Sequence, residues 1–314
     1  MAGTQMTIRV LKPGLWTTVQ DRGRYGYAHL GISPCGAADP LSLRIANLLA
    51  GNDEYAPAFE MTLLGATLEV DQSAIVAVSG ASCICKVGPY RVAEHTAVEV
   101  PAGGVLQCGP INGGARCYLA IQGGIDVPFV MGSASTDIRG RFGGLEGCRL
   151  QAGDVIRTNK AGGQRPGRLR AGAWDELRRS GPIRVTRGAQ NDWFSPDEWA
   201  KFLAATYAVS EQSDRAGLRL TGETVTPRER RQLLTDGIPL GAIQVPQDGQ
   251  PIILFVDQQT TGGYPKIGNV IAADMHRIGQ LRPRDEVRFS EVSIPAAIEA
   301  LRQQERWLQE IWQD

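Results

Sequence analysis

Histidine is scarce in this sequence, and the cysteines are not arranged as a metal-binding motif. Only three histidines occur among 314 residues, and none of the six cysteines forms a CxxC pair. Structural zinc sites use closely spaced cysteine and histidine ligands, so we expect no metal site. His29, His95 and His276 stand alone in the chain. We expect ordinary side-chain roles for them rather than a Ser-His-Asp or Cys-His mechanism.

An excess of charge of one sign is also absent. The chain has 33 Lys and Arg against 33 Asp and Glu, so its formal net charge is zero. This balance excludes a general basic surface for nucleic acid or for an anionic membrane. The longest uncharged stretch, 100–115, contains Gly, Asn, Gln and Pro and is shorter than the roughly 20 apolar residues of a membrane-spanning helix. The N-terminus has no signal-sequence pattern, so we expect a cytoplasmic protein with reduced cysteines.

Several catalytic signatures are missing. The sequence has no GxxxxGK loop followed by Ser or Thr, no G-x-S-x-G nucleophile elbow and no HExxH zinc motif. An Ala-Met-Lys-Met sequence for biotin attachment is absent as well. Any ATP must therefore be held at a site of another type, and we expect no bound biotin on this chain.

Glycine, by contrast, is abundant. It accounts for 38 of the 314 residues, well above the usual share of about 7%. Gly-rich turns separate short strand-like runs at 67–70, 75–79, 97–100 and 117–121. Short strands at this spacing are typical of a barrel or a sandwich. We therefore predict a mainly β fold with short helices.

A few helices have clear boundary signals. Asp39 and Pro40 begin a helix that ends at Gly51, since Asp is a favoured cap and Pro a favoured first residue. Capping boxes at Ser195–Glu198 and Thr226–Glu229 predict two more helices. We also expect strands at 183–186 and 252–256, and helices at 269–280 and 295–311.

The length favours two domains of roughly 150 residues each. We predict domains at 1–160 and 181–314, joined by a linker at 161–180. The arginine-rich linker is either a solvated connection or a docking patch for an acidic partner. Trp307 and Trp312 near the C-terminus either pack against the second domain or serve docking. A faint repeat, LQAGDVIR at 150–157 and LRPRDEVR at 281–288, agrees with two similar barrels.

Polar residues gather at a few places where chemistry is possible. Asp257 follows a buried strand and precedes a Thr-Thr-Gly-Gly turn, where glycine N–H groups can converge on an anion. Asp257 is then a base or an amide-binding group, and the alternative is a simple capped turn. Asp214 and Arg215 form either a carboxylate clamp or a structural ion pair. Cys35 is a nucleophile candidate or a buried thiol, and residues 132–137 gather hydroxyls beside a carboxylate.

Motifs along nearly the whole chain resemble one family. It is the biotin-dependent carboxyltransferase family, of the allophanate hydrolase subunit 2 type, and its 5-oxoprolinase branch is the most similar. The matching strings, in order, are TTVQDRGR at 17–24, GISPCGAAD at 31–39, GGIDVP at 123–128, MGSASTD at 131–137, SDR at 213–215, QVP at 244–246 and DQQTTGGYP at 257–265.

The resemblance implies a fold and partners. The expected fold is two cyclophilin-like β-barrel domains. The 5-oxoprolinase branch implies a subunit that works with a B subunit, of the allophanate hydrolase subunit 1 type, and with an A subunit. Together they cleave 5-oxo-L-proline to L-glutamate while hydrolysing ATP. A second reading is a carboxyltransferase subunit that acts on urea or a similar amide, and a third is a regulatory partner of a kinase-inhibitor-type subunit.

Candidate site residues follow from the motifs. Many family members have Ser and Met where this chain has Cys35 and Ala38, so we do not expect nucleophilic catalysis by Cys35. ATP is expected at a site shared with the partner subunit. The expected catalytic residues are Asp257, Asp39 and Tyr264, and the expected substrate- or phosphate-binding residues are Arg215, Asp214, Gln244, Thr260, Thr261, Gly262, Gly263, Gln20 and Glu60.

Overall fold

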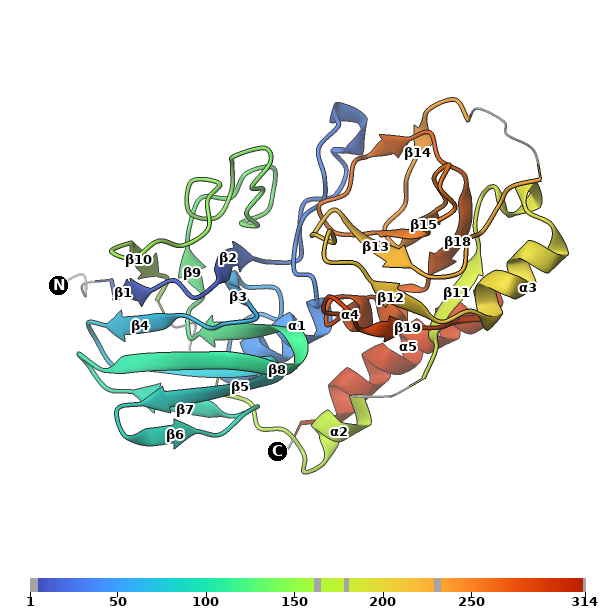
Figure 1. Ribbon diagram of the computed structural model, residues 1–314. Helices are drawn as coiled ribbons and strands as arrows, with labels where there is room; N and C mark the ends of the chain where they lie inside the picture. Colours follow the sequence, from blue (N-terminus) through green and yellow to red (C-terminus); the bar gives the residue numbers. More distant parts are fainter. Residues whose placement is uncertain (1–4, 161–164, 178–180, 229–232, 313–314) are drawn as a thin grey trace. The chain divides into compact units, whose positions relative to one another are not determined.

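The computed structural model describes residues 5–160, 165–177, 181–228 and 233–312 (Figure 1). The chain divides into two compact units. The first unit comprises Met1–Arg24, Cys35–Leu177 and Ile311–Asp314, and the second comprises Tyr25–Pro34 and Arg178–Glu310. The short excursion at 25–34 is therefore assigned to the second unit, although the sequence on either side of it belongs to the first.

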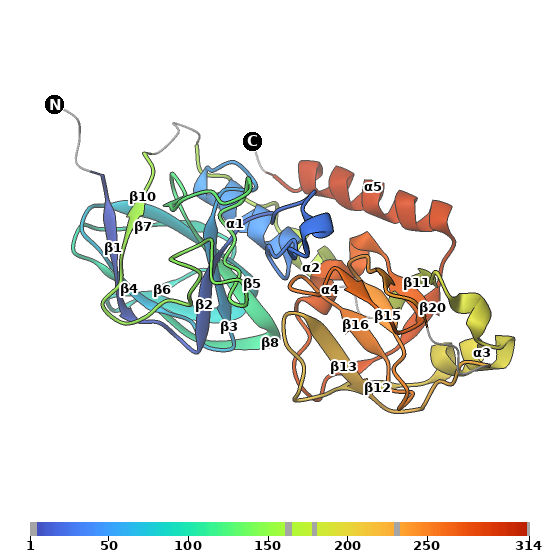
Figure 2. The same ribbon diagram turned by 90° about the horizontal axis from the view of Figure 1, so that it is seen from above.

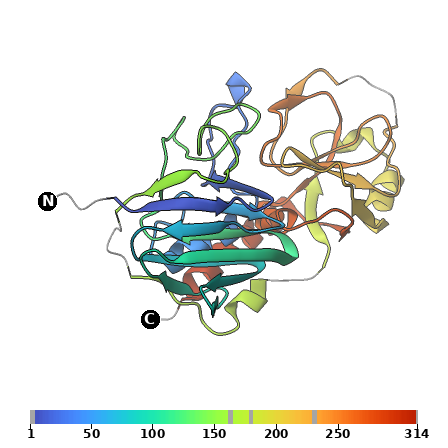
Figure 3. The same cartoon turned by 60° about the vertical axis from the view of Figure 1, so that its left-hand side comes forward.

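The first unit is a barrel-like antiparallel sheet, and Figure 3 shows its strands side by side. The described part runs in the order β2-β3-β8-β4-β1-β10-β9, while β5 pairs with β8 and carries β6 and β7. The long strand β8 pairs with β5 along one edge and with both β4 and β3 along the other. The strand bounds are β1 Thr7–Lys12, β2 Trp16–Gln20, β3 Ala58–Thr62, β4 Thr67–Val70, β5 Ala74–Val87, β6 Tyr90–Val92, β7 Ala97–Val100, β8 Val105–Ile121, β9 Ile125–Asp126 and β10 Val155–Thr158.

Alternation of side chains builds the core of this sheet. Ile8 and Val10 in β1, Leu68 in β4 and Ile156 in β10 are buried in one apolar cluster, with more exposed residues between them. Successive residues of a strand point to opposite faces, so one face of each strand is apolar. The predicted strands at 67–70 and 97–100 are confirmed residue for residue as β4 and β7.

Helix α1 (Pro40–Ala50) packs against β5 and β8. The Asp39 carboxylate accepts a hydrogen bond of 2.9 Å from the Ser42 backbone N–H, as an N-cap does. Gly51 ends the helix with a left-handed φ of 76°, a conformation that costs glycine little. The predicted helix is thus confirmed, together with both of its boundary residues.

The second unit holds another barrel-like sheet, in the order β19-β12-β13-β16-β15-β18-β11-β20 within the described chain, and a separate pair, β14 and β17. All of its described pairings are antiparallel except that of β11 with β20, which is parallel. The strand bounds are β11 Ile183–Arg187, β12 Tyr207–Val209, β13 Gly217–Thr221, β14 Asp236–Gly237, β15 Ala242–Gln244, β16 Ile252–Leu254, β17 Thr261–Gly262, β18 Lys266–Val270, β19 Glu286–Val287 and β20 Phe289–Glu291.

Helices and 3-10 turns flank the sheets, and Figure 2 shows the long helix α5 beside the sheet of the second unit. Ser195 caps α3 through the Glu198 backbone N–H, and Phe202 of α3 stacks on Phe289 at 4.7 Å between ring centroids. The predicted helices at 195 and 295–311 are confirmed. The bounds are α2 Ala173–Leu177, α3 Pro196–Ala204, α4 Met275–Ile278, α5 Ile294–Glu310, η1 Ala28–Leu30, η2 Asn191–Trp193 and η3 Ala272–Asp274.

The faint sequence repeat corresponds to a repeated turn. In the first unit, the Asp154 carboxylate accepts a hydrogen bond from the Gln151 N–H at 2.7 Å. The Asp154 carbonyl accepts one from the Val10 N–H at 2.9 Å, and Gly153 donates back to the Val10 carbonyl at 2.8 Å. This turn leads into β10 and fixes Ile8 opposite Ile156.

The second unit repeats these hydrogen bonds one for one. The Asp285 carboxylate accepts from the Arg282 N–H at 2.8 Å. The Asp285 carbonyl accepts from Val209 at 2.9 Å, and Arg284 donates back to Val209 at 2.7 Å. Tyr207 then pairs with Val287 as Ile8 pairs with Ile156. The two units therefore share one turn and one strand register, which indicates internal duplication.

Two expectations about local structure need correction. The helix predicted at 269–280 is wrong in its first part, because Asn269 and Val270 belong to β18, and η3 and α4 follow. β-Branched residues such as Val270 are favoured in strands, and here β11 and β15 pair with β18 on its two sides. The helix predicted from Thr226 is also wrong for 226–228, while 229–232 lie outside the described residues.

The predicted linker is partly ordered by contacts within the first unit. Leu169 bridges to Trp312, and Trp174 of α2 stacks on His95 with 3.8 Å between ring centroids. Arg170 forms an ion pair with Glu176 at 2.8 Å. Residues 161–164 and 178–180 lie outside the described parts. None of the described helices is long and apolar enough to cross a membrane.

The acid stability of the second unit depends on Asp274. Its carboxylate is buried and accepts hydrogen bonds from the backbone and side chain of Arg184, the shortest at 2.6 Å. Burial alone raises the pKa of Asp274, but the hydrogen bonds and charge of Arg184 outweigh it and hold the pKa below its ordinary value. The ionised form is therefore favoured by folding.

We expect Asp274→Asn to lower the free energy of unfolding at pH 7 by about 2 kcal/mol. This is less than the roughly 3–5 kcal/mol of a fully buried pair, because Arg184 is partly exposed. The difference in unfolding free energy between wild type and variant is fully present above about pH 4, the pKa of an aspartate in the unfolded chain. It is lost as the pH falls through the lower pKa that Asp274 has in the folded protein. Urea unfolding of both proteins from pH 7 to pH 2.5 tests this, and a difference that stays constant over that range contradicts it.

None of the six cysteines, all of which lie within the described residues, forms a disulfide. Cys83, Cys85 and Cys108 meet in the first core, with Sγ atoms 3.4 Å apart between Cys85 and Cys108. The neighbouring Cys83 thiol and burial raise the pKa of Cys108, so that this thiol stays protonated. Such thiols act as small apolar side chains, and only Cys148 is exposed.

We expect a thiol reagent such as DTNB to modify one cysteine rapidly in the native protein and all six after unfolding. The Cys148→Ser variant serves as the control, since it removes the rapid phase and leaves the unfolded count one lower. Rapid modification of a second native thiol contradicts the described burial.

Candidate functional site

Glu60, one of the candidate residues of the first unit, belongs to a row of buried polar side chains across its sheet. Thr18, Glu60, Tyr118 and Ser79 are successive register partners on β2, β3, β8 and β5. Residues directly opposite in antiparallel strands share one face. The row therefore lies on a single face of the sheet, away from the apolar residues that alternate with it.

This row is joined by hydrogen bonds to the start of α1. Tyr118 donates to Glu60 at 2.6 Å and accepts from the Asp39 N–H at 2.8 Å. Glu60 also accepts from the Ala38 N–H at 2.8 Å and lies 3.6 Å from the Arg116 guanidinium. Burial, followed by the nearby charge of Glu60, raises the pKa of Tyr118. Asp39 and Glu60 thus hold the helix to the sheet.

Gln20 and the hydroxyl cluster at 132–137 serve a second buried network. The Asp21 carboxylate accepts hydrogen bonds of 2.6 Å from both Ser133 and Ser135. Gln20 donates to Thr18 at 3.0 Å, and its buried Oε1 has no partner among the described residues. Cys35 is buried, with a φ of 53°. Cys35 thus lacks the solvent exposure that a reactive cysteine has.

In the second unit, Arg215 and Asp257 are paired with each other. Arg215 Nε and Nη2 donate to the two carboxylate oxygens of Asp257 at 2.9 and 3.1 Å, and both side chains are 11% exposed. Such a bidentate pair is among the stronger charge-assisted contacts. The sequence placed both residues at the site, but it assigned Arg215 to a ligand rather than to Asp257.

Asp214 shapes the turn that precedes this pair. Its carboxylate accepts from the backbone N–H groups of Ala216 and Gly217 at 2.8 and 3.1 Å, which makes it the cap of the turn. The turn leads into β13 and directs Arg215 towards Asp257. Arg215 thus forms an ion pair with Asp257, and the expected clamp for a substrate carboxylate stays a prediction.

The Thr-Thr-Gly-Gly segment is extended. Thr261 and Gly262 form β17, which pairs with Asp236 and Gly237 of β14. The Thr260 carbonyl accepts from the Ile238 N–H at 3.0 Å. Neither Gly262 nor Gly263 has a left-handed φ, and the Tyr264 ring that follows is 44% exposed.

Gln244 is the predicted residue with the clearest unused binding capacity. It is buried in β15, and its Nε2 has no hydrogen-bond partner in the described chain. A Cβ added at Gly262 would lie 3.0 Å from this Nε2, so the glycine permits the close approach. Gln258 lies nearby, since its Nε2 donates to the Ile238 carbonyl at 3.0 Å, and its buried Oε1 is likewise unpartnered in the described parts.

Lys266 is the functional candidate that the sequence did not reveal. Its side chain is 2% exposed, and its Nζ lies 2.8 Å from the carboxylate of Asp236, whose side chain is 49% exposed. The hydrogen bond and charge of Lys266 lower the pKa of Asp236. The available signal was its position, directly after the 257–265 motif and at the start of a strand-like run. The charge of a lysine does not by itself predict that its side chain is buried.

A β-bulge brings Lys266 opposite Gln244. Ala242 pairs with Asn269 and Ile243 with Gly268, but Gln244 pairs with Lys266, so Ile267 is the extra residue. Bulges of this kind redirect side chains near functional sites. The site of the second unit thus combines a buried ammonium, an unpartnered amide donor within the described ranges and the Arg215–Asp257 pair.

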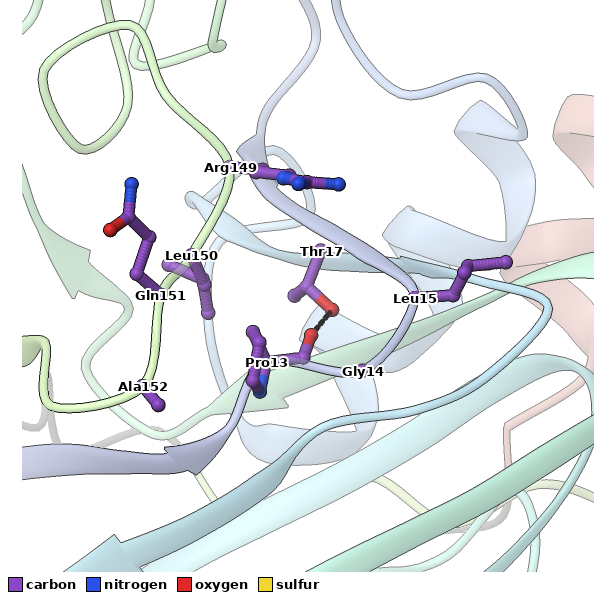
Figure 4. Close-up of a pocket in the computed structure, with 8 residues that line it drawn as sticks. All are labelled: Pro13, Gly14, Leu15, Thr17, Arg149, Leu150, Gln151 and Ala152. Atoms are coloured by element: carbon purple, nitrogen blue, oxygen red, sulfur yellow. Dashed lines mark hydrogen bonds between the residues drawn. The ribbon is translucent and has the colours of Figure 1, made fainter.

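The first unit carries hollows on its described surface. One of about 430 Å³ is lined by Pro13, Thr17 and Arg149 among others, as Figure 4 shows. A second, of about 840 Å³, is lined by Leu11, Ile84 and Pro110 among others. Both contain few polar groups that converge. Across the described ranges, no group of three or more His, Cys, Asp or Glu side chains is placed to hold a metal.

Two barrel-like sheets with a duplicated turn define a two-barrel protein of the carboxyltransferase-domain class. The chain belongs to the family described as carboxyltransferase domain, subdomain A and B, whose model matches residues 30–291. It is 38% identical over 304 residues to the C subunit of 5-oxoprolinase from Escherichia coli, covering 97% of each chain. It is also 38% identical to the corresponding 5-oxoprolinase subunit from Haemophilus influenzae, with 94% of each chain covered.

A solved structure supports the same fold. The urea carboxylase of Kluyveromyces lactis superposes with a TM-score of 0.90 at 30% identity, covering 98% of this chain and 29% of that one. The two expected barrels are thereby confirmed, and so is the predicted family.

Proposed function

We propose that this chain is the C subunit of an ATP-dependent 5-oxoprolinase. The observation that carries the proposal is the match to two proteins named as the C subunit of 5-oxoprolinase over nearly their full lengths. A match to a domain alone would leave the activity open, because one fold hosts many functions. The site agrees with a small polar substrate, since Lys266 and Gln244 present a cation and an amide donor.

The proposed reaction explains the need for partners and for ATP. A lactam is a poor electrophile, and transfer of the terminal phosphoryl group of ATP to its oxygen activates the carbonyl carbon. Water then adds to that carbon, the C–N bond breaks with the nitrogen leaving as the amine, and a second water hydrolyses the resulting acyl phosphate to glutamate and phosphate. We propose that the A and B subunits complete the enzyme in the cytoplasm and that ATP occupies a site shared with a partner. The chain has no Walker loop and no biotin attachment sequence of its own.

A second candidate is carboxyl transfer to urea or a similar amide. The likeness to the Kluyveromyces lactis urea carboxylase favours it. The chain is also 32% identical to a urea amidolyase of Saccharomyces cerevisiae, of which it covers 17%. This function requires biotin and its carboxylase in trans. A regulatory role through binding of a B-type subunit is the third candidate, and it predicts complex formation without turnover.

The test is phosphate release from ATP by the full chain mixed with A- and B-type subunits of 5-oxoprolinase. We expect release that depends on this chain and on 5-oxo-L-proline, with glutamate formed in equal amount. Release that is independent of 5-oxoproline contradicts the proposal. Carboxylation of urea with a biotin carrier then tests the second candidate, and a stable complex without either activity supports the third.

We expect Asp257→Asn to abolish turnover in the assembled complex without dissociating it. The substitution removes the negative charge that orients Arg215 through two hydrogen bonds, so the guanidinium is left nearly buried and mispositioned. Glutamate formation and size-exclusion chromatography measure the two effects. Asp192→Asn, at an exposed position of the same unit, is the control. Full activity of the Asp257 variant would falsify the assigned role.

A further inference from the structure

Lys266 is a buried cation with a single anion beside it in the described chain. A buried ammonium is costly unless an anion compensates it. Asp236 supplies that anion at 2.8 Å, but its own side chain is half-exposed. The ammonium has three N–H donors, and Asp236 is the one side chain among the described residues that accepts from it.

The segment that holds Asp236 has little strand pairing. Asp236 lies on β14, and β14 pairs over two residues with β17 and with no other described strand. So short a pairing contributes little stability on its own. The Asp236 carboxylate also accepts from the Gly237 N–H at 2.8 Å and from Gln190 Nε2 at 3.5 Å, so a ligand carboxylate that replaces it at Lys266 must compete with these contacts as well.

Gln244 presents a second unused group beside this cation. Gln244 and Lys266 are opposite partners at the bulge, and opposite Cβ atoms in antiparallel strands lie about 5 Å apart on one face. The amide donor of Gln244 is buried and lacks a partner within the described ranges. An unmade buried hydrogen bond costs about 1–3 kcal/mol, which a ligand carbonyl recovers.

We propose that Lys266 and Gln244 form a recognition site for a small amide that also bears a carboxylate. Lys266 binds the ligand carboxylate in place of Asp236, and Gln244 Nε2 donates to the amide carbonyl. This inference rests on the proposed function and names the groups by which its substrate is selected. Lys266 is then a specificity residue, and Asp236 is an internal substitute for the ligand.

The test is ligand-observed NMR titration of the full chain with 5-oxo-L-proline and with 2-pyrrolidinone, the same lactam without the carboxylate. We expect Lys266→Met to weaken 5-oxoproline binding at least tenfold and to leave pyrrolidinone binding unchanged. Asp236→Asn removes the internal competitor and strengthens 5-oxoproline binding severalfold. Gln244→Met weakens both ligands alike. Lys201→Met removes an exposed ion pair of the same unit and changes neither.

Thermal melts of each variant separate binding from folding. If the Lys266–Asp236 pair is only structural, Lys266→Met and Asp236→Asn both lower Tm. They then leave the ratio of the 5-oxoproline affinity to the pyrrolidinone affinity unchanged, and this result overturns the inference. Absence of 5-oxoproline binding to the wild-type chain overturns it too. Turnover by the assembled enzyme that survives Lys266→Met refutes this inference and leaves the proposed function intact. Carboxylate-dependent binding without turnover refutes the proposed function alone.

Discussion

Both barrels depend on one constraint. Where the chain makes a tight turn before a strand, its backbone N–H and C=O groups must still find hydrogen-bond partners. The aspartate turns at 151–154 and 282–285 meet this need in the same way. In each turn the aspartate carboxylate accepts from a backbone N–H of the turn, and the aspartate carbonyl accepts from a backbone N–H of the partner strand, β1 or β12. Buried backbone groups without partners are costly. The turn therefore fixes the register of β1 with β10 and of β12 with β19, and these registers determine which side chains face each core.

The duplicated frame carries different chemistry in its two copies. In the first unit the buried acids hold structure, since Asp39 caps α1 and Glu60 accepts from Tyr118 and from the Ala38 N–H. Their hydrogen bonds are used within the fold. In the second unit a bulge breaks the regular ladder and leaves Gln244 with a donor unused by the described residues, beside Lys266. Buried polar atoms without partners are unusual in folded proteins, and among the described residues the first unit also has one in Gln20 Oε1. The second site differs in that its unpartnered amide lies opposite a buried lysine.

Local signals predicted local structure well. Asp39, Pro40 and Gly51 define α1 because caps and terminators act within one turn of the chain. The same holds for Ser195 at α3 and for the alternation in β4. The helix expected at 269–280 failed because its first residues lie between β11 and β15, and the sequence does not reveal those distant partners.

The site was harder to predict for the same reason. Asp257, Arg215 and Gln244 were found as polar residues in motifs, yet their pairing depends on contacts between residues far apart in the chain. Lys266 escaped notice because its burial follows from a one-residue bulge, and a shift of one residue moves a strand side chain to the other face. Without that extra residue, Lys266 would not lie opposite Gln244. The selectivity that we propose for this site thus depends on the register of β15 with β18 and not on the presence of a lysine alone.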